Sequence, residues 1–235
     1  MAEVVQGILE DMSSDLIDLQ TREVFSSSEI KEIIENRKKH EYKLARNKPS
    51  KKHFFSAISY ELDLEDQRLQ HRQELNSKPA PSDKSITRRI LSLFRRFSKV
   101  HKADVLVWKE YINFCIRSNS KRELSQVLAK CLQFHSRSVE LWLISKCIEV
   151  EVNKNIESGR SVLQRALDLN PENKDLWTEY FKFEAEHGAG TDSVVVVFRY
   201  ATEKLPGIRL SLLKLAEKLL LPKDQILEMK RLSIT

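Results

Sequence analysis

The sequence predicts an all-α protein, an α-solenoid of helix-pair repeats preceded by long N-terminal helices. Only 5 glycines and 6 prolines occur in 235 residues, of which 31% are charged and 41% hydrophobic. This composition favours helices over a turn-rich β protein. Apolar residues recur at steps of three and four along most of the chain, as they do on one face of a helix. Tryptophans also recur at a nearly fixed interval, which indicates a repeat.

Residues 1–50 are expected to form an N-terminal helical region with a basic segment. An apolar stripe at helical spacing runs through the first twenty residues. Ser26 and Glu29 have the spacing of a capping box, so a long helix is expected from there to Arg46, and Pro49 ends it. We expect the first helix to pack on this long helix, and docking on a partner is the alternative.

Residues 51–210 are expected to hold the repeats. This range begins with a second long helix, which starts near Ser50 and is followed by a loop at SKPAPSD. Trp108, Trp142 and Trp177 lie 34 and 35 residues apart, and VLQRALDLNP and VFRYATEKLP repeat at an offset of 35. The run VVVVF has strand composition but lies in a helical period, which favours a buried helix. Residues 211–235 are expected to form C-terminal helices that begin a further repeat, so we expect a short form or a truncated chain.

The repeated side chains predict a structural interior. Positions three and seven residues after each tryptophan share its helix face, and stacked helix pairs bury such a face. A buried Glu184 needs a partner, and we expect a backbone N–H or an arginine such as Arg165. The predicted repeat core consists of Phe54, Trp108, Tyr111, Trp142, Glu149, Arg165, Trp177, Tyr180 and Glu184.

The sequence carries no signature of catalysis. Its three cysteines lack CxxC spacing and its six histidines are scattered, so we expect buried thiols, no disulfides and no metal or cofactor. The stretch HGAGTD lacks a phosphate-binding frame and predicts a turn between helices. No apolar run is long enough to cross a membrane. We therefore expect neither an enzyme nor a protein with a small-molecule substrate.

Charge is distributed unevenly. Residues 1–30 carry seven acids and one base, whereas residues 31–102 carry nineteen bases and nine acids. Such a basic region can contact RNA phosphates or the acidic surface of a protein, or it can be a solvated helix face. The candidate contact residues are Arg37, Lys38, Lys39, Lys43, Arg46, Lys48, Lys51, Lys52, Arg88, Arg89, Arg95 and Arg96.

One motif resembles a known repeat family. The pattern W-x-x-Y-x-x-x-E, preceded by R-A-L-x-x-x-P, resembles the HAT (half-a-tetratricopeptide) repeat of RNA-processing proteins. The best-matching copy contains Arg165, Ala166, Leu167, Pro171, Trp177, Tyr180 and Glu184. The copies at Trp108 and Trp142 depart from the pattern, with Cys115 in place of the Glu and Ser145 in place of the Tyr.

The N-terminal third is similar to one branch of that family. The segments F-S-x-x-E-I and R-K-K-x-E-Y-K-L-x-R resemble HAT subunits of the UtpB subcomplex of the small-subunit processome. The resemblance implies a non-catalytic scaffold of the nucleolus. It also implies β-propeller partners and proximity to the U3 snoRNP and pre-rRNA during small-subunit biogenesis. The alternatives are a HAT scaffold of pre-mRNA splicing or 3′-end processing and a direct RNA-binding factor that uses the basic N-terminal helices.

Overall fold

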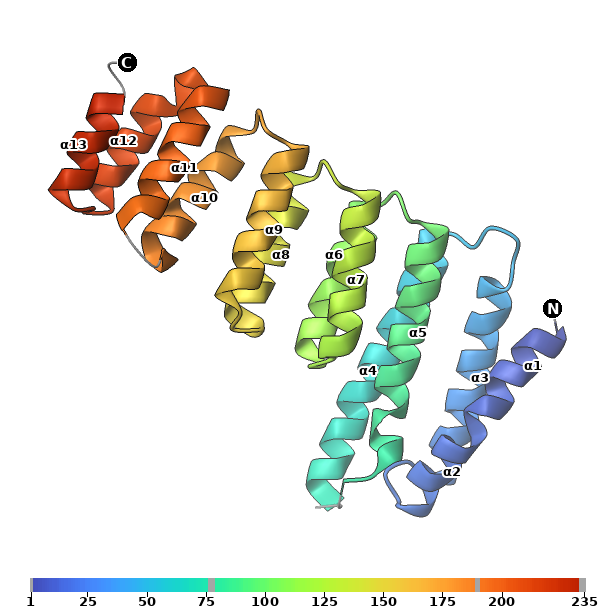
Figure 1. The fold of residues 1–235 in the computed structure, drawn as a ribbon. Helices are drawn as coiled ribbons and strands as arrows, with labels where there is room; N and C mark the ends of the chain where they lie inside the picture. Colours follow the sequence, from blue (N-terminus) through green and yellow to red (C-terminus); the bar gives the residue numbers. More distant parts are fainter. Residues whose placement is uncertain (1, 76–78, 189–190, 233–235) are drawn as a thin grey trace. The chain divides into compact units, whose positions relative to one another are not determined.

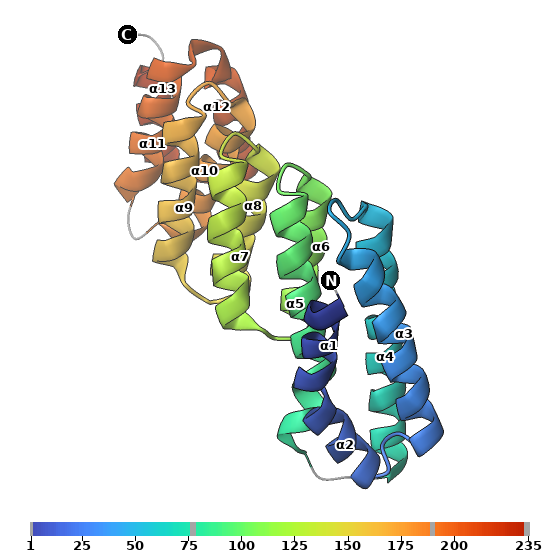
Figure 2. The same cartoon turned by 90° about the vertical axis from the view of Figure 1, so that its right-hand side faces the viewer.

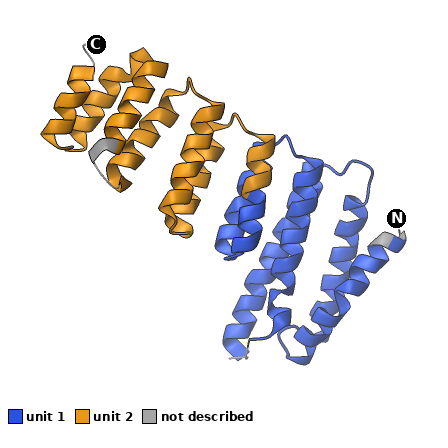
Figure 3. Ribbon diagram, viewed as in Figure 1, with its two compact units in different colours: residues 1–127 blue, residues 128–235 orange. Residues whose placement is uncertain are grey.

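The structure is a computed structural model that describes residues 2–75, 79–188 and 191–232. All regular elements in these ranges are helices, and no strand occurs among them. Short turns join successive helices into pairs (Figure 1). These features confirm the predicted all-α repeat fold. The chain divides into two compact units, residues 1–127 and residues 128–235 (Figure 3). The division at residues 50 and 210 stays a prediction.

Unit 1 is built on three neighbouring helices, α3, α4 and α5, of which α4 contacts both of the others (Figures 1 and 2). The stretch predicted as the first helix is divided at Met12 into α1 and α2. Helix α1 packs against α3, which confirms the expected packing. The elements of this unit are α1 (Ala2–Asp11), α2 (Ser13–Thr21), α3 (Ser27–Leu44), α4 (Lys51–Leu75), the 3₁₀ turn η1 (Pro81–Lys84), α5 (Ser85–Val100), α6 (Val105–Arg117) and the first half of α7 (Lys121–Phe134).

The predicted capping box begins α3. The Ser26 backbone N–H donates to Glu29 Oε2 at 2.7 Å, and the Glu29 N–H donates to Ser26 Oγ at 3.3 Å. Two of the N–H groups that a helix start leaves without partners are thereby satisfied. The helix ends at Leu44, two residues before the predicted end.

Stacked aromatic rings fix α5 between its neighbours. Phe97 of α5 stacks on Phe54 of α4 with a centroid distance of 4.7 Å, and Phe94 stacks on Tyr111 of α6 at 5.1 Å. Such pairs contribute about 0.5–1.5 kcal/mol beyond the burial of their surface. The interior of unit 1 therefore sets which face of α5 remains available to solvent.

Unit 2 continues the helix pairs. The run VVVVF lies in α11, where Val194, Val195, Val197 and Phe198 are buried, so the predicted buried helix is confirmed. The elements after α7 are α8 (Val139–Cys147), the π-helical turn η2 (Ile148–Val152), α9 (Ile156–Leu169), α10 (Lys174–His187), α11 (Thr191–Lys204), the 3₁₀ turn η3 (Pro206–Ile208), α12 (Arg209–Lys218) and α13 (Lys223–Leu232).

The local structure of unit 2 explains the positions of two glycines. A Cβ on Gly159 would lie 2.6 Å from Val150 Cγ2, so glycine permits the close approach of α9 to η2. Gly188 is the C-cap residue of α10. This position agrees with the turn predicted at HGAGTD, although Gly190 of that turn lies outside the described residues.

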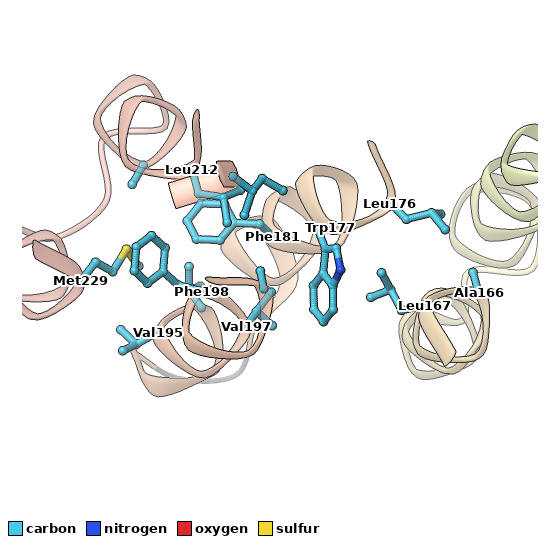
Figure 4. Close-up of a cluster of buried hydrophobic side chains, with 14 of the residues drawn as sticks. Ala166, Leu167, Leu176, Trp177, Phe181, Val195, Val197, Phe198, Leu212 and Met229 are labelled. Atoms are coloured by element: carbon cyan, nitrogen blue, oxygen red, sulfur yellow. The ribbon is translucent and has the colours of Figure 1, made fainter. Parts of the chain in front are cut away.

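The core of unit 2 gathers side chains from six of the described helices, α8 to α13. Trp177 of α10 lies between Leu167 of α9 and Val197 of α11 (Figure 4). Leu212 of α12 and Met229 of α13 close the other side, and both are fully buried. Neighbouring pairs therefore share one continuous interior, as in repeat proteins whose stability comes from contacts between adjacent repeats.

Among the described helices, none combines the length and the apolar character of a membrane span.

Candidate interaction site

Three of the twelve candidate contact residues lie in an ion-pair network inside unit 1. Arg37 is 3% exposed and binds Glu61 through two hydrogen bonds of 2.9 and 2.7 Å. Arg89 bridges Glu61 at 2.6 Å and Glu41 at 3.0 Å. Arg96 also binds Glu41, at 2.8 Å. The network connects α3, α4 and α5.

This network corrects the sequence-based assignment. The carboxylates of Glu41 and Glu61 are 1–2% exposed, so they need the guanidinium groups that surround them. Arg37 and Arg89 are therefore structural residues and are not available to a partner. Arg96 is committed to the same network through Glu41, although its side chain is 34% exposed.

Three further candidates form ion pairs near the surface. Arg88 binds Asp15 at 2.9 Å, and Arg95 binds Glu123 at 2.6 Å. Lys51 pairs with Asp104. The three basic side chains are 53–54% exposed, whereas their carboxylate partners are 13–31% exposed. These cations are therefore accessible, but each is partly engaged within unit 1.

The remaining six candidates lie at the surface, and we call them the α3–α4 cation strip. They surround the C-terminal end of α3 and the start of α4, and the helix dipole favours positive charge at the end of α3. Apart from Lys39, which lies 4.0 Å from Glu35, none has an ion pair with another described residue. The strip consists of Lys38, Lys39, Lys43, Arg46, Lys48 and Lys52.

The predicted repeat core contains a feature that sequence reasoning missed. Each repeat tryptophan donates its indole N–H to the carbonyl oxygen six residues earlier. Trp108 donates to Lys102 at 2.8 Å, Trp142 to Ser136 at 2.7 Å, and Trp177 to Pro171 at 2.7 Å. All three tryptophans are buried. The ring thus fills the interior while its nitrogen holds the turn that precedes the helix.

The partner expected for Glu184 was partly wrong. Glu184 is 3% exposed and receives the guanidinium of Arg160 of α9, at 2.6 and 3.3 Å. Arg165 is exposed, because it lies five residues further along α9 and therefore on a different face. Glu149, at the equivalent position of the preceding repeat, lies in η2 and accepts from Asn153 at 3.0 Å.

The other predicted core positions are buried or partly buried. Phe54 is 1% exposed and stacks on Phe97. Tyr111 donates its hydroxyl to Glu123, and the Tyr180 hydroxyl accepts from Gln164 at 3.0 Å. Burial raises the pKa of Cys131 to about 12, which makes this thiol unreactive at neutral pH.

Sequence reasoning also missed a second group of cations in unit 1. Lys84, Arg117, Lys121 and Arg122 are exposed and line a cavity of about 960 Å³, together with Arg68. The stretch RSNSKR between α6 and α7 carries three of them. The sequence could have predicted this group, because basic residues on both sides of a short turn are brought together when the turn joins the two helix ends.

Buried tryptophans at a fixed interval, each anchored to the preceding turn, define a helical repeat protein. Residues 80–203 match the family model described as PRP39 N-terminal HAT repeat, which assigns the repeats to the HAT class. Residues 9–91 match the model described as U3 small nucleolar RNA-associated protein 6.

Related proteins extend the second match. The Schizosaccharomyces pombe U3 small nucleolar RNA-associated protein 6 is 34% identical over 189 residues, which cover 80% of this chain and 39% of that protein. The Homo sapiens homologue is 35% identical over the same share of this chain and 32% of its own length. The Dictyostelium discoideum homologue is 28% identical over 95% of this chain and 36% of its own length. This chain belongs to the U3 small nucleolar RNA-associated protein 6 family and spans less than half the length of these relatives.

One solved structure also resembles the chain at a low level. The tetratricopeptide protein YrrB aligns with 77% of this chain, with a TM-score of 0.39 and 18% sequence identity.

Proposed function

We propose that this chain is a non-catalytic scaffold in U3 snoRNP-linked processing of the small-subunit rRNA precursor. The observation that carries the proposal is the match of residues 9–91 to the U3 small nucleolar RNA-associated protein 6 model, with relatives of that name at 34–35% identity. In this proposal the chain works in the nucleolus, within the UtpB subcomplex. Its partners are the β-propeller subunits of that subcomplex, the U3 snoRNP and pre-rRNA.

In this proposal the chain acts by binding other macromolecules and does not catalyse a reaction. Helix pairs present broad surfaces to other macromolecules, and the α3–α4 cation strip offers positive charge with little internal pairing. In the proposal the strip contacts RNA phosphates or an acidic partner inside the particle. Such contacts weaken with salt, because each phosphate that is neutralised releases a counterion.

A co-purification experiment tests the scaffold role. The tagged chain would be isolated from cells, and its RNA and protein partners would be identified. We expect U3 RNA, pre-rRNA and β-propeller proteins. Recovery of spliceosomal or 3′-end processing components in their place would refute the proposal and support the second candidate, a HAT scaffold of those pathways. The match of residues 80–203 to a PRP39 HAT model is the observation that keeps this second candidate.

A salt series tests direct RNA binding by the strip. Affinity for a structured RNA would be measured for the wild type and for Lys38→Gln/Lys43→Gln/Arg46→Gln/Lys48→Gln. We expect the variant to bind more weakly, with a salt slope lower by about 0.7–0.9 for each phosphate that it no longer neutralises. The matched control replaces four exposed lysines elsewhere, Lys130, Lys154, Lys214 and Lys218, with glutamine. An equal loss of RNA affinity in both variants would show that net charge, and not the strip, determines binding.

A further inference from the structure

Unit 1 contains a cavity that the proposed function does not use. It has a volume of about 960 Å³ and lies between α4, the η1–α5 segment and the turn from α6 to α7. All of its lining residues belong to unit 1. Ligand sites in proteins typically have volumes of about 300–1,000 Å³, so this cavity can take a few residues of a bound chain.

The charge of the cavity is strongly positive. Eight basic and four acidic residues line it. Three of the acids are already paired, since Glu65 binds Arg68, Asp83 binds Arg22, and Glu123 binds Arg95. The unpaired excess lies at the rim, where four exposed cations have no ion pair or side-chain hydrogen bond with another described residue. These are Lys84, Arg117, Lys121 and Arg122.

A buried guanidinium forms part of the cavity wall. Arg68 is 4% exposed, and two of its nitrogens bind Glu65, each at 2.8 Å. Its third nitrogen, Nη1, is buried without a hydrogen-bond partner among the described residues and lies 4.0 Å from Asp83 Oδ1. A buried donor without an acceptor is unfavourable. An anionic oxygen that reached Nη1 would satisfy it.

The backbone of the turn between α6 and α7 is fixed before any ligand binds. Ser118 Oγ donates to the Phe114 carbonyl at 2.8 Å, and the Ser120 N–H donates to the Cys115 carbonyl at 2.9 Å. Asn119 has a φ of 50°, in the left-handed region that asparagine tolerates better than most residues. Because the turn is fixed, its backbone needs little ordering when a ligand binds.

We infer that this cavity binds an acidic segment of a partner protein, in which aspartate or glutamate carboxylates alternate with apolar side chains. Carboxylates match the guanidinium forks of Arg117 and Arg122. Leu69, which is 42% exposed on the lining, provides a contact for an apolar neighbour. The inference rests on the proposed scaffold role, since it names the chemistry of one partner.

The lining favours a peptide over RNA. Proteins that bind single strands stack bases on exposed aromatic side chains. The aromatic residue of this lining is Phe114, which is 5% exposed and stacks on Phe94. The cavity therefore offers cations and an apolar contact but no platform for bases.

The test uses the full chain and three fluorescent probes. These are a short peptide in which Glu alternates with Leu, the same peptide with Gln for Glu, and an oligouridylate. We expect the Glu–Leu peptide to bind, the Gln–Leu peptide to bind at least about tenfold more weakly, and Arg117→Gln/Arg122→Gln to lose about tenfold in affinity for the Glu–Leu peptide. The control Lys154→Gln/Lys214→Gln, with the same change in charge, should bind like the wild type.

Two results would overturn the inference. One is equal binding of the Glu–Leu and Gln–Leu peptides. The other is tighter binding of oligouridylate that is abolished in the Arg117→Gln/Arg122→Gln variant, which would assign the cavity to RNA. If circular dichroism shows that this variant is misfolded, Lys84→Gln/Lys121→Gln takes its place. Peptide binding by a chain that does not co-purify with U3 RNA would refute the proposed function and leave the cavity assignment intact.

Discussion

At the scale of single residues, the repeat tryptophans combine an apolar ring with one polar anchor. Each indole N–H donates to a backbone carbonyl six residues earlier, at 2.7–2.8 Å. The N-cap residues Asp104 and Asn173, four residues before Trp108 and Trp177, accept a hydrogen bond from the first turn of the same helix. The start of the helix is therefore fixed both by its cap and by its tryptophan.

The first prediction tests that anchor. Trp177→Phe keeps an aromatic ring but removes the donor, so the Pro171 carbonyl loses its partner, and the smaller ring also leaves a cavity. We expect the free energy of unfolding to fall by about 1–3 kcal/mol for the lost hydrogen bond and further for the cavity, measured by urea denaturation monitored by circular dichroism. Tyr200→Phe, at a side chain that is 49% exposed in the same unit, is the control and should leave stability unchanged. A decrease no larger than that of the control would show that the indole N–H contributes nothing.

A second residue-scale prediction compares two glutamates at equivalent repeat positions. Glu184→Ala leaves Arg160 without its buried partner, and we expect the free energy of unfolding to fall by about 2–4 kcal/mol. Glu149→Ala removes a half-buried side chain that accepts from Asn153, and we expect a decrease of less than about 1 kcal/mol. Thermal and urea unfolding of both variants would measure the difference. Similar decreases would contradict the distinct roles that we assign to the two positions.

At the scale of elements, α3 divides its charges between two faces. Arg37 and Glu41 share the buried stripe with Ile30, Ile33 and Leu44, whereas the neighbouring lysines of the α3–α4 cation strip point to solvent. A run of basic residues in the sequence can therefore contain both buried and exposed side chains. Their positions in the helical period separate buried from exposed residues, whereas the composition of the run does not.

The η1 turn supplies the third prediction, which concerns pH. Burial alone would raise the pKa of Asp83, but hydrogen bonds from Arg22 and the Ala80 N–H, with the charges of Arg22 and Arg72, lower it below its usual value. Because the folded pKa is lower than the unfolded pKa, ionised Asp83 contributes stability that is complete above about pH 4. This contribution is lost as pH falls through the folded pKa.

Urea denaturation at neutral and acidic pH would measure this effect. Asp83→Asn should be less stable than the wild type at pH 7 and should approach it in acid. Asp66→Asn, at an exposed residue of α4 without an ion pair to another described residue, is the control and should follow the wild type at both pH values. A constant difference between Asp83→Asn and the wild type would show that ionisation of Asp83 is not linked to folding.

At the scale of the whole molecule, a fourth prediction follows from the division into two units. Stability in repeat proteins is approximately a sum of local terms. Leu163→Ala, at a fully buried position of α9, should cost about 2–5 kcal/mol. Hydrogen exchange should show reduced protection in α8 to α11, with α3 to α5 little changed. An equal reduction in both regions would indicate a single cooperative unit.

Much of the fold was predictable, because it depends on local spacing. The capping box at Ser26, the tryptophan interval and the buried helix at VVVVF all follow from neighbours within one or two turns or from a fixed repeat. The ion-pair network was not predictable in the same way. Glu61 meets Arg37 and Arg89 across 24 and 28 residues, and nothing in the local pattern selects those partners. Three of the candidate contact residues, Arg37, Arg89 and Arg96, therefore lie in this network.

The tryptophan anchor has a consequence for how such repeats diverge. Its acceptor is a main-chain oxygen, which every residue type possesses. The acceptor positions are indeed occupied by lysine, serine and proline, at Lys102, Ser136 and Pro171. Substitutions at these sites leave the bond itself in place, whereas the donor has no substitute among the other side chains of similar shape. A repeat of this kind can drift in sequence until its tryptophan is almost the only visible trace of a common geometry.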